Sequence, residues 1–229
     1  MYDIPIELNL REKSIVAYEQ EPIEKGKILF YGHSLFTRWG SPKWGYRRMD
    51  EDIRMKDGSL AVVNHGFGTS CAEELLYYYG RMVRPWKPRA LVVAAYGNDL
   101  MYGYSPEDVM NVLSRLLHWA RTDFPGIRLY IVEAFPTAKK RTEAKEEKWN
   151  SARFKRDKFN KMIRAYAATH EDTKVIEMWN CPELFETPED VGDRTKIRED
   201  IFVKDRTHFT QEGYDIAAKI FREALDDLL

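Results

Sequence analysis

Short apolar runs alternate along this chain with longer amphipathic segments, and this alternation constrains the fold more than any other feature. Short apolar runs bounded by turn residues predict buried strands, whereas apolar residues at helical spacing predict helices between them. Such a pattern is typical of a parallel sheet with helices on both faces. We therefore expect an α/β fold with five strands, at residues 27–31, 60–64, 90–95, 128–134 and 174–177.

The composition is that of a globular protein with a substantial core. Of the 229 residues, 44% are hydrophobic and 13% aromatic, which excludes wholesale disorder. The net charge is −1, with acids and bases interspersed, so the chain lacks the excess of basic residues that is typical of a nucleic-acid-binding protein. We expect a single domain over residues 1–229, in which residues 1–26 form an N-terminal arm and helix.

The N-terminal segment and the two cysteines indicate where in the cell the protein is expected. No basic start is followed by an apolar leader, and no run approaches the roughly 18 apolar residues of a membrane span. Cys71 and Cys181 have no ligand-like spacing, which predicts free thiols in a reducing compartment. We expect a cytoplasmic protein, although export by a leaderless route, or a leader missing from this sequence, stays open.

Several helix starts can be read from capping residues. Ser105-Pro106-Glu107-Asp108 has the pattern of an N-cap, a first-turn proline and a capping-box acid. Ser70 with Glu73 predicts a second capping box after the second strand, and the last helix is predicted to start near Thr210. The charge-dense stretch 139–158 fits either a solvated helix face or a mobile flap beside the site.

Polar motifs follow the predicted strands. Ser34 follows the first strand, residues 64–70 the second and residues 96–99 the third, and residues 205–208 lie between the fifth strand and the last helix. In an open parallel sheet, ligands bind beyond the carboxyl ends of the strands. We therefore expect these four motifs to form one site.

The residue types in these motifs point to nucleophilic catalysis. A serine hydroxyl is a poor nucleophile without a base, and His208 can supply one. Asp205, three residues earlier, can fix the tautomer of the imidazole and stabilise its charged form. The order Ser34, Asp205, His208 favours a hydrolase.

An oxyanion formed at Ser34 would need hydrogen-bond donors, and side chains nearby would contact the substrate. The candidate donors are the backbone N–H of Ser34, an N–H in the Gly68-Thr69 turn and the side-chain amide of Asn98. Candidate substrate contacts are apolar or aromatic residues that fit a core position equally well: Leu35, Trp39, Met101, Tyr102 and Trp179.

Four blocks resemble those of the SGNH hydrolases, the GDSL-type esterase and lipase superfamily. They are Phe30-Tyr31-Gly32-His33-Ser34-Leu35 through Trp39, then Asn64-His65-Gly66-Phe67-Gly68, Gly97-Asn98-Asp99 and Asp205-Arg206-Thr207-His208. The resemblance is greatest to the subgroup with a Trp closing the nucleophile block. It implies a three-layer, flavodoxin-like α/β/α fold with strand order 2-1-3-4-5, ester hydrolysis through an acyl-enzyme, and no cofactor.

Two positions depart from the family pattern. His33 stands where the family has an Asp before the nucleophile, a residue outside the acid–base machinery. Thr69 stands where a Gly usually supplies one oxyanion N–H. Threonine keeps that N–H, but its β-branch restricts φ and narrows the site.

We expect a serine ester hydrolase that cleaves a carboxylic ester, with a short acyl group on a carbohydrate or another polar alcohol. The expected partner is a small-molecule ester, without nucleic acid or a membrane span, and the oligomeric state stays open. The alternatives are a catalytically weak, flavodoxin-like binding module and acyl transfer to an alcohol.

Other interpretations of the same residues are structural or metal-based. Ser34 could cap a helix, Asn98 could occupy a left-handed turn, and Asp99 is expected to hold the crevice loops. His33 and His65 could join His208 and Asp99 around a metal. Side chains of adjacent residues point in different directions, and no spacing typical of metal ligands recurs among these residues. We therefore expect no metal site.

Overall fold

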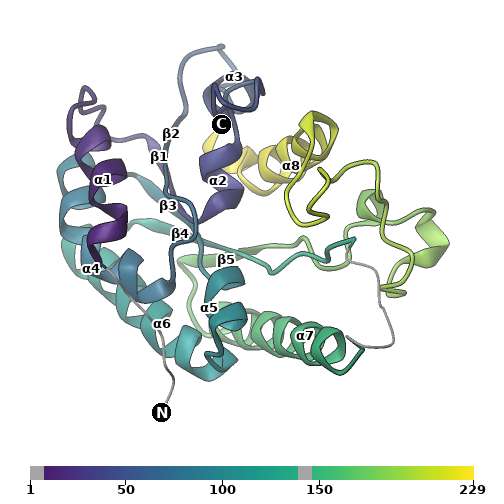
Figure 1. Cartoon of the computed structure of the whole chain (residues 1–229). Coiled ribbons are helices and arrows are strands. Elements are labelled where there is room, and N and C mark those ends of the chain that lie inside the picture. Colours follow the sequence, from purple (N-terminus) through teal and green to yellow (C-terminus); the bar gives the residue numbers. More distant parts are fainter. Residues whose placement is uncertain (1–7, 139–145) are drawn as a thin grey trace.

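The computed structural model describes residues 8–138 and 146–229. Its centre is a five-stranded, all-parallel sheet in the order β2-β1-β3-β4-β5 (Figure 1). The expected α/β fold and strand order are confirmed. The strands are β1 (Ile28–Gly32), β2 (Val62–Gly66), β3 (Ala90–Ala94), β4 (Arg128–Val132) and β5 (Thr173–Ile176).

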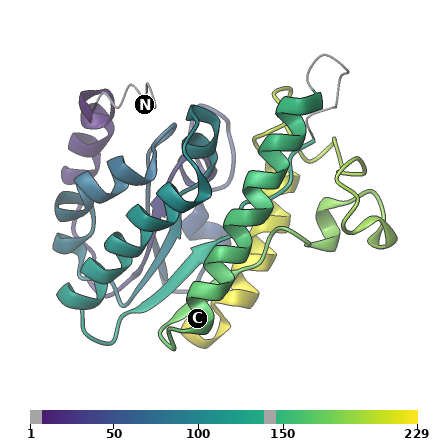
Figure 2. The ribbon, with the colours of Figure 1, turned by 90° about the horizontal axis from the view of Figure 1, so that it is seen from below.

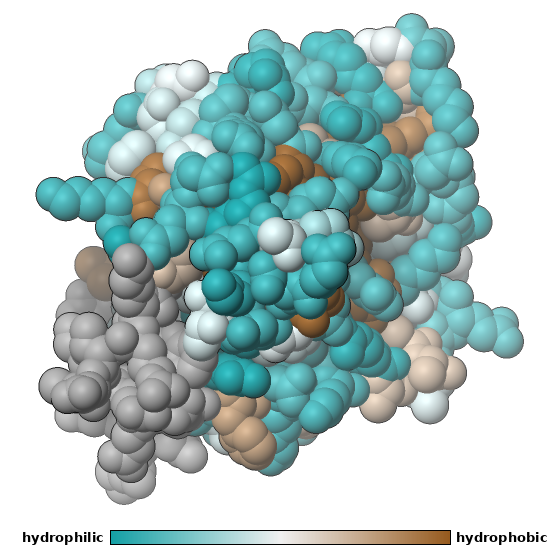
Figure 3. Space-filling model, turned by 90° about the vertical axis from the view of Figure 1, so that its right-hand side faces the viewer, coloured by the Kyte–Doolittle hydropathy of each residue, from teal (hydrophilic) through white to brown (hydrophobic). Residues whose placement is uncertain are grey.

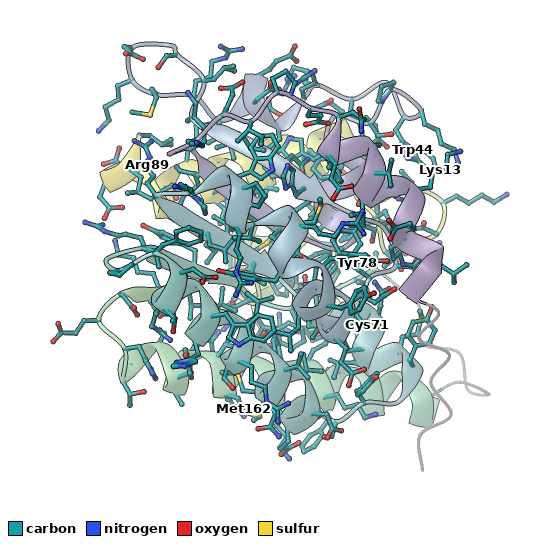
Figure 4. All side chains as sticks on the ribbon, turned by 90° about the vertical axis from the view of Figure 1, so that its left-hand side faces the viewer. Lys13, Trp44, Cys71, Tyr78, Arg89 and Met162 are labelled. Atoms are coloured by element: carbon teal, nitrogen blue, oxygen red, sulfur yellow. The ribbon has the colours of Figure 1, made fainter. Side chains whose placement is uncertain are left out.

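Helices cover both faces of the sheet (Figure 2). One face carries α4 (Ala72–Met82), α6 (Pro106–Asp123) and α7 (Glu146–Ala168), and the other carries α2 (Ser34–Arg38), α3 (Met49–Asp52) and α8 (Gln211–Ala224). Helix α1 (Glu12–Glu19) crosses α4 near Tyr78 (Figure 4), and α5 (Gly97–Tyr102) follows β3. Short 3₁₀ turns are η1 (Leu8–Arg11), η2 (Arg84–Trp86), η4 (Pro182–Leu184), η5 (Pro188–Asp190) and η6 (Asp226–Leu228).

The central strands are buried along their whole length, which explains why they read as continuous apolar runs. Every residue of β1 and β3 is buried. Gly32, at the end of β1, lies so close to β3 that an added Cβ would meet the Ala94 carbonyl oxygen at 2.6 Å. Gly66 is equally close to α2, because its Cβ would lie 2.5 Å from the backbone nitrogen of Thr37. Gly32 thus allows β1 to lie close to β3, and Gly66 allows α2 to pack directly against the end of β2.

The strands lie within two residues of their predicted positions. The largest shift is at β2, which begins at Val62 rather than Leu60, because Leu60 instead pairs with Arg54 in an isolated antiparallel bridge. Asn64 and His65 therefore lie inside the strand rather than after it.

The predicted helix starts are confirmed at two places and wrong at one. Ser105 Oγ accepts the Asp108 N–H at 3.1 Å, and Thr210 caps α8. The Ser70/Glu73 box is wrong by one residue. The loop after β2 runs one residue further, so the carboxylate of Glu74 accepts the Cys71 N–H at 2.8 Å.

The two segments with less certain predictions lie partly outside the described residues. Residues 1–7 of the N-terminal arm and residues 139–145 of the charged stretch are not described, whereas residues 146–158 form the first part of α7. Within residues 8–138 and 146–229, no helix combines the length and the apolar character needed to cross a membrane.

Candidate active site

Ser34 lies at the first turn of α2, immediately after the central strand β1. His33 precedes it in an extended conformation, and its Nδ1 accepts the Leu35 N–H at 3.2 Å. His33, not Ser34, is therefore the cap of this helix, and the hydroxyl of Ser34 is not used for capping. In Figure 1, α2 and α5 both begin where β1 and β3 end, which is the edge of the sheet predicted to hold the site.

His208 reaches Ser34 from the segment between β5 and α8. Its Nε2 lies 2.9 Å from Ser34 Oγ, and its Nδ1 lies 2.7 Å from Asp205 Oδ2. The structure thus brings together three residues that sequence analysis grouped across 174 positions. The order of contacts is hydroxyl, imidazole, carboxylate, as in a catalytic triad.

The carboxylate of Asp205 is held mainly by residues two and three positions later in the sequence. Its Oδ1 accepts the backbone N–H groups of Thr207 and His208, both at 2.9 Å, and Arg38 Nη1 lies 3.5 Å from Oδ2. Burial alone would raise the pKa of Asp205, but the hydrogen bonds from His208 and Thr207 outweigh burial and lower it. The carboxylate therefore stays ionised and can hold the Nδ1 proton of the imidazole.

A hydrogen bond ties together the two motifs that contain the other predicted oxyanion donors. Asn98, in the first turn of α5, uses one amide hydrogen on the Ser70 carbonyl oxygen at 2.9 Å, which leaves the second one for another acceptor. Within the described part of the chain, no acceptor is bonded to the backbone N–H of Ser34 or of Thr69. All the predicted oxyanion donors are therefore available, and Asn98 does not adopt the left-handed conformation of a turn.

Thr69 itself has a left-handed backbone, with φ of 60°. Threonine rarely adopts this conformation, whereas glycine adopts it without strain. Its hydroxyl donates to the Gly68 carbonyl oxygen at 2.7 Å, and its own carbonyl accepts from Arg11 Nη2 at 3.2 Å. The φ value explains why glycine suits this position, and the hydroxyl is turned to the backbone.

Asp99 ties the second and third motifs together. Its side chain is 2% exposed, and Oδ1 accepts the Ala72 N–H at the start of α4 at 2.7 Å. Oδ2 has no hydrogen-bond partner among the described residues. Burial raises the pKa of Asp99 to about 7, against the lowering effect of the Ala72 hydrogen bond. The geometry fits the structural role expected for this residue.

The predicted substrate contacts separate into buried and exposed residues. Trp39 is 2% exposed, packs against Tyr214 and Phe221, and donates its indole N–H to Asp52 at 2.8 Å. Leu35 is also buried, so the prediction that these two line the substrate site is corrected to core positions. Leu35 lies in α2 and Trp39 directly follows this helix, and both belong to the core because α2 packs against the sheet.

The other three predicted contacts also divide. Trp179 is covered by Arg194, whose guanidinium lies 4.1 Å from the ring centroid. Met101 and Tyr102, at the end of α5, are exposed by 62% and 41%. These two are the predicted contacts that a substrate can reach.

A model of the GDSL-like lipase/acylhydrolase family matches residues 30–216, a span that contains all four motifs. The chain belongs to this family. A search of curated protein sequences finds no significant match. Membership in the GDSL-like family identifies the protein as an ester hydrolase at the level of its family.

Solved structures share the fold of this GDSL-like protein at low sequence identity. A GDSL-like lipase from Bacteroides thetaiotaomicron is 17% identical, with a TM-score of 0.69 over 97% of this chain and 98% of that one. A lipase/acylhydrolase from Enterococcus faecalis is 16% identical, with a TM-score of 0.65 over 88% and 96%. The esterase EstA from Pseudoalteromonas is 11% identical, with a TM-score of 0.62 over 89% and 98%. At these identities the likeness concerns the fold.

Two arginines of this GDSL-like protein were not predicted from its sequence as candidate site residues. Arg38 contacts Asp205, and its position one helical turn after Ser34 could have indicated that it faces the same way. Arg156 lies on α7, where nothing in the sequence distinguishes it from the surrounding charged residues. In the described residues, no three His, Cys, Asp or Glu side chains gather as metal ligands, and His65 instead packs between Tyr18 and Trp86.

Proposed function

We propose that the protein is a serine ester hydrolase in which Ser34 is the nucleophile, His208 the general base and Asp205 the orienting acid. The observation that carries this proposal is the continuous pair of short contacts, 2.9 Å from Ser34 Oγ to His208 Nε2 and 2.7 Å from His208 Nδ1 to Asp205 Oδ2. This geometry lets the carboxylate hold the Nδ1 proton, so that Nε2 faces the serine as an acceptor.

Acylation begins when Ser34 Oγ attacks the ester carbonyl carbon and its proton moves to His208 Nε2. The carbonyl oxygen then becomes negative, and the N–H groups of Ser34 and Thr69, with the free amide hydrogen of Asn98, stabilise it. Each such donor contributes about 2.7–4 kcal/mol of barrier lowering in related chemistry. The C–O bond to the alcohol breaks as His208 returns the proton to the leaving oxygen.

Deacylation repeats these steps with water as the attacking group. His208 takes a proton from water, the hydroxyl attacks the acyl-enzyme, and Ser34 leaves with the proton that His208 returns. An alcohol in place of water would give acyl transfer with the same residues.

The substrate that we propose is a short acyl ester of a carbohydrate or another polar alcohol. The side of the molecule on which the segment between β5 and α8 lies is largely hydrophilic, with hydrophobic atoms visible between polar ones (Figure 3). Tyr102 supplies an exposed ring of the kind that packs on a sugar face. We also propose that residues 1–229 form one SGNH-type domain. We further propose that it belongs to the subgroup in which a Trp ends the nucleophile block, and Trp39 stands at that position.

Labelling with an organophosphonate tests the proposal directly. We expect one adduct per molecule on Ser34, measured by intact-mass spectrometry, and almost none in Ser34→Ala or His208→Ala. Ser114→Ala, which removes an exposed hydroxyl on α6, is the matched control and should label like the parent protein. Folded protein without any adduct would favour the binding-module alternative.

A further inference from the structure

Arg156 projects from α7 toward the motifs that surround Ser34. Its Nη1 donates to Thr137 Oγ1 at 3.3 Å, and Thr137 lies in the segment that follows β4. Its charge also acts on His33 and Tyr96, the residues that directly precede Ser34 and Gly97. Phe159, nearly one turn further along α7, packs against the Tyr96 ring with centroids 5.9 Å apart, so this part of α7 lies beside the residue that precedes the third motif.

The guanidinium of Arg156 has no carboxylate partner among the described residues. The Thr137 hydroxyl is its hydrogen-bond partner there, whereas Arg164 on the same helix pairs with Glu133 and Arg121 pairs with Asp172. Arg156 is half-buried, and burial lowers its pKa. Arginine nevertheless stays charged, and a cation withdrawn from water without an anion is unfavourable.

Two buried polar groups close to Arg156 also lack partners in the described part of the chain. His33 Nδ1 accepts the Leu35 N–H, so the neutral ring carries its proton on Nε2, and this N–H is unpaired. Burial, followed by the charges of His208 and Arg156, lowers the pKa of His33 to about 3, so the ring is neutral. The O–H group of Tyr96 likewise donates to no acceptor among the described residues, and the Tyr96 ring packs edge-on against His33 with centroids 4.9 Å apart.

Among the described residues, this region thus combines a cation that has no carboxylate partner with two buried hydrogen-bond donors that have no acceptor. A buried donor without an acceptor is unfavourable, and arginine binds carboxylates through two parallel N–H bonds. We propose that the ester substrate carries a carboxylate, which Arg156 binds beside Ser34 with the hydroxyl of Thr137. This inference rests on the proposed esterase function and narrows its substrate class. Arg156 is then a specificity-determining residue.

Four esters in a pH-stat assay test the proposal and locate the carboxylate. Monoethyl succinate carries the charge on the acyl side and ethyl butyrate is its neutral match. Acetoxyacetate carries it on the alcohol side, and 2-methoxyethyl acetate is the neutral match. We expect kcat/KM for one charged ester to exceed that of its match by about tenfold or more.

Variants of α7 separate binding of the carboxylate from a general effect on folding. Arg156→Gln should lower kcat/KM for the preferred charged ester about tenfold more than for its neutral match, and Arg156→Lys should restore part of the difference. Lys161→Gln removes an exposed cation from the same helix and should leave the preference unchanged. Equal rates for charged and neutral esters in the parent protein, or an undiminished preference in Arg156→Gln, would overturn the proposal.

A binding measurement distinguishes failure of this inference from failure of the esterase function. Calorimetric titration of the Ser34→Ala protein with monoethyl succinate and with acetoxyacetate should show binding of the preferred charged ester, and Arg156→Gln should abolish that binding. Such binding without hydrolysis of any ester would refute the esterase but support the carboxylate site. Hydrolysis of neutral esters without carboxylate binding would refute the carboxylate site alone.

Discussion

Ser34 and His208 lie within hydrogen-bonding distance of each other, yet different parts of the molecule hold them. Ser34 follows the central strand of the sheet, where the His33 N–H donates to Ala94 and Gly32 accepts from Phe67. His208 lies in a turn outside the sheet, where Val203 donates to the His208 carbonyl oxygen and Arg206 donates to Val203. Asp205 in that turn is 43% exposed at its side chain.

The difference shows two ways of fixing a reactive group. The proposed nucleophile and its proposed oxyanion donors depend on buried contacts between distant strands and helices. The proposed acid–base pair depends on hydrogen bonds within four residues. It contacts the other half through Ser34, at 2.9 Å from His208, and through Arg38, at 3.5 Å from Asp205. Substitutions in the turn should therefore affect chemistry with little effect on folding, whereas substitutions in the buried half should affect both.

The largest expected effect comes from Asp205→Asn, in the exposed half. Asparagine keeps an oxygen for the N–H groups of Thr207 and His208, but its amide favours the wrong imidazole tautomer. We expect turnover of nitrophenyl acetate to fall about 10⁴-fold. Thermal unfolding should stay within a few degrees of the parent protein, because the side chain is exposed. A rate close to that of the parent protein would show that Asp205 does not orient His208, and Asp226→Asn is the exposed control.

Asn98→Ala, in the buried half, comes next. It deletes the amide hydrogen proposed for the oxyanion and the bond to Ser70. Turnover should fall roughly 10²- to 10³-fold, with KM changed much less, because the lost bond forms mainly in the transition state. Unlike Asp205→Asn, this substitution should also lower the unfolding temperature. Equal losses in kcat and affinity for a product analogue would argue against a role in the transition state.

Asp99→Asn, also in the buried half, should change how the free energy of unfolding depends on pH. The folded protein holds the Asp99 proton up to a pKa of about 7, whereas the ordinary value is 3.8. Between these values the unfolded chain is ionised and the folded one is not, so the free energy of unfolding falls as pH rises. The variant should lack this contribution, which amounts to about 1.4 kcal/mol per pH unit.

Urea unfolding of both proteins from pH 4 to pH 8 measures the difference. The free energy of unfolding of Asp99→Asn, minus that of the parent protein, should increase as pH rises. This difference should become constant above the pKa of Asp99. Curves that stay parallel over the whole range would mean that the pKa of Asp99 is not raised. Asp226→Asn, at an exposed position, should follow the parent protein.

The smallest expected effect is at Thr69. Thr69→Gly removes the strain of a left-handed threonine and should stabilise the protein by about 1 kcal/mol. Thr69→Ala keeps most of that strain, so it serves as the matched variant. Activity should be kept or raised in both, because the proposed donor is the backbone N–H. A loss in Thr69→Ala as large as that in Asn98→Ala would assign the catalytic role to the hydroxyl instead.

The sequence alone determined what depends on local patterns. The strands were predicted within two residues because apolar runs between turn residues report burial directly, and the Ser105 and Thr210 caps involve neighbours three residues apart. The contact between Asp205 and His208 was predictable for the same reason. Even so, the loop after β2 was misjudged by one residue, because the Asp99 carboxylate, 27 positions away, takes part in the start of α4.

The tertiary structure decided what depends on distant contacts. It placed Trp39 and Leu35 in the core, because α2 packs against Gly66 and leaves no space between helix and sheet. It gave Thr69 a positive φ, which residue type does not predict. It also brought Arg156, from a charge-dense stretch, into contact with Thr137 in the segment after β4. A sequence gives the spacing of charged residues along one helix. Whether a charged side chain contacts a carboxylate or a hydroxyl is decided by the strands and loops packed against that helix.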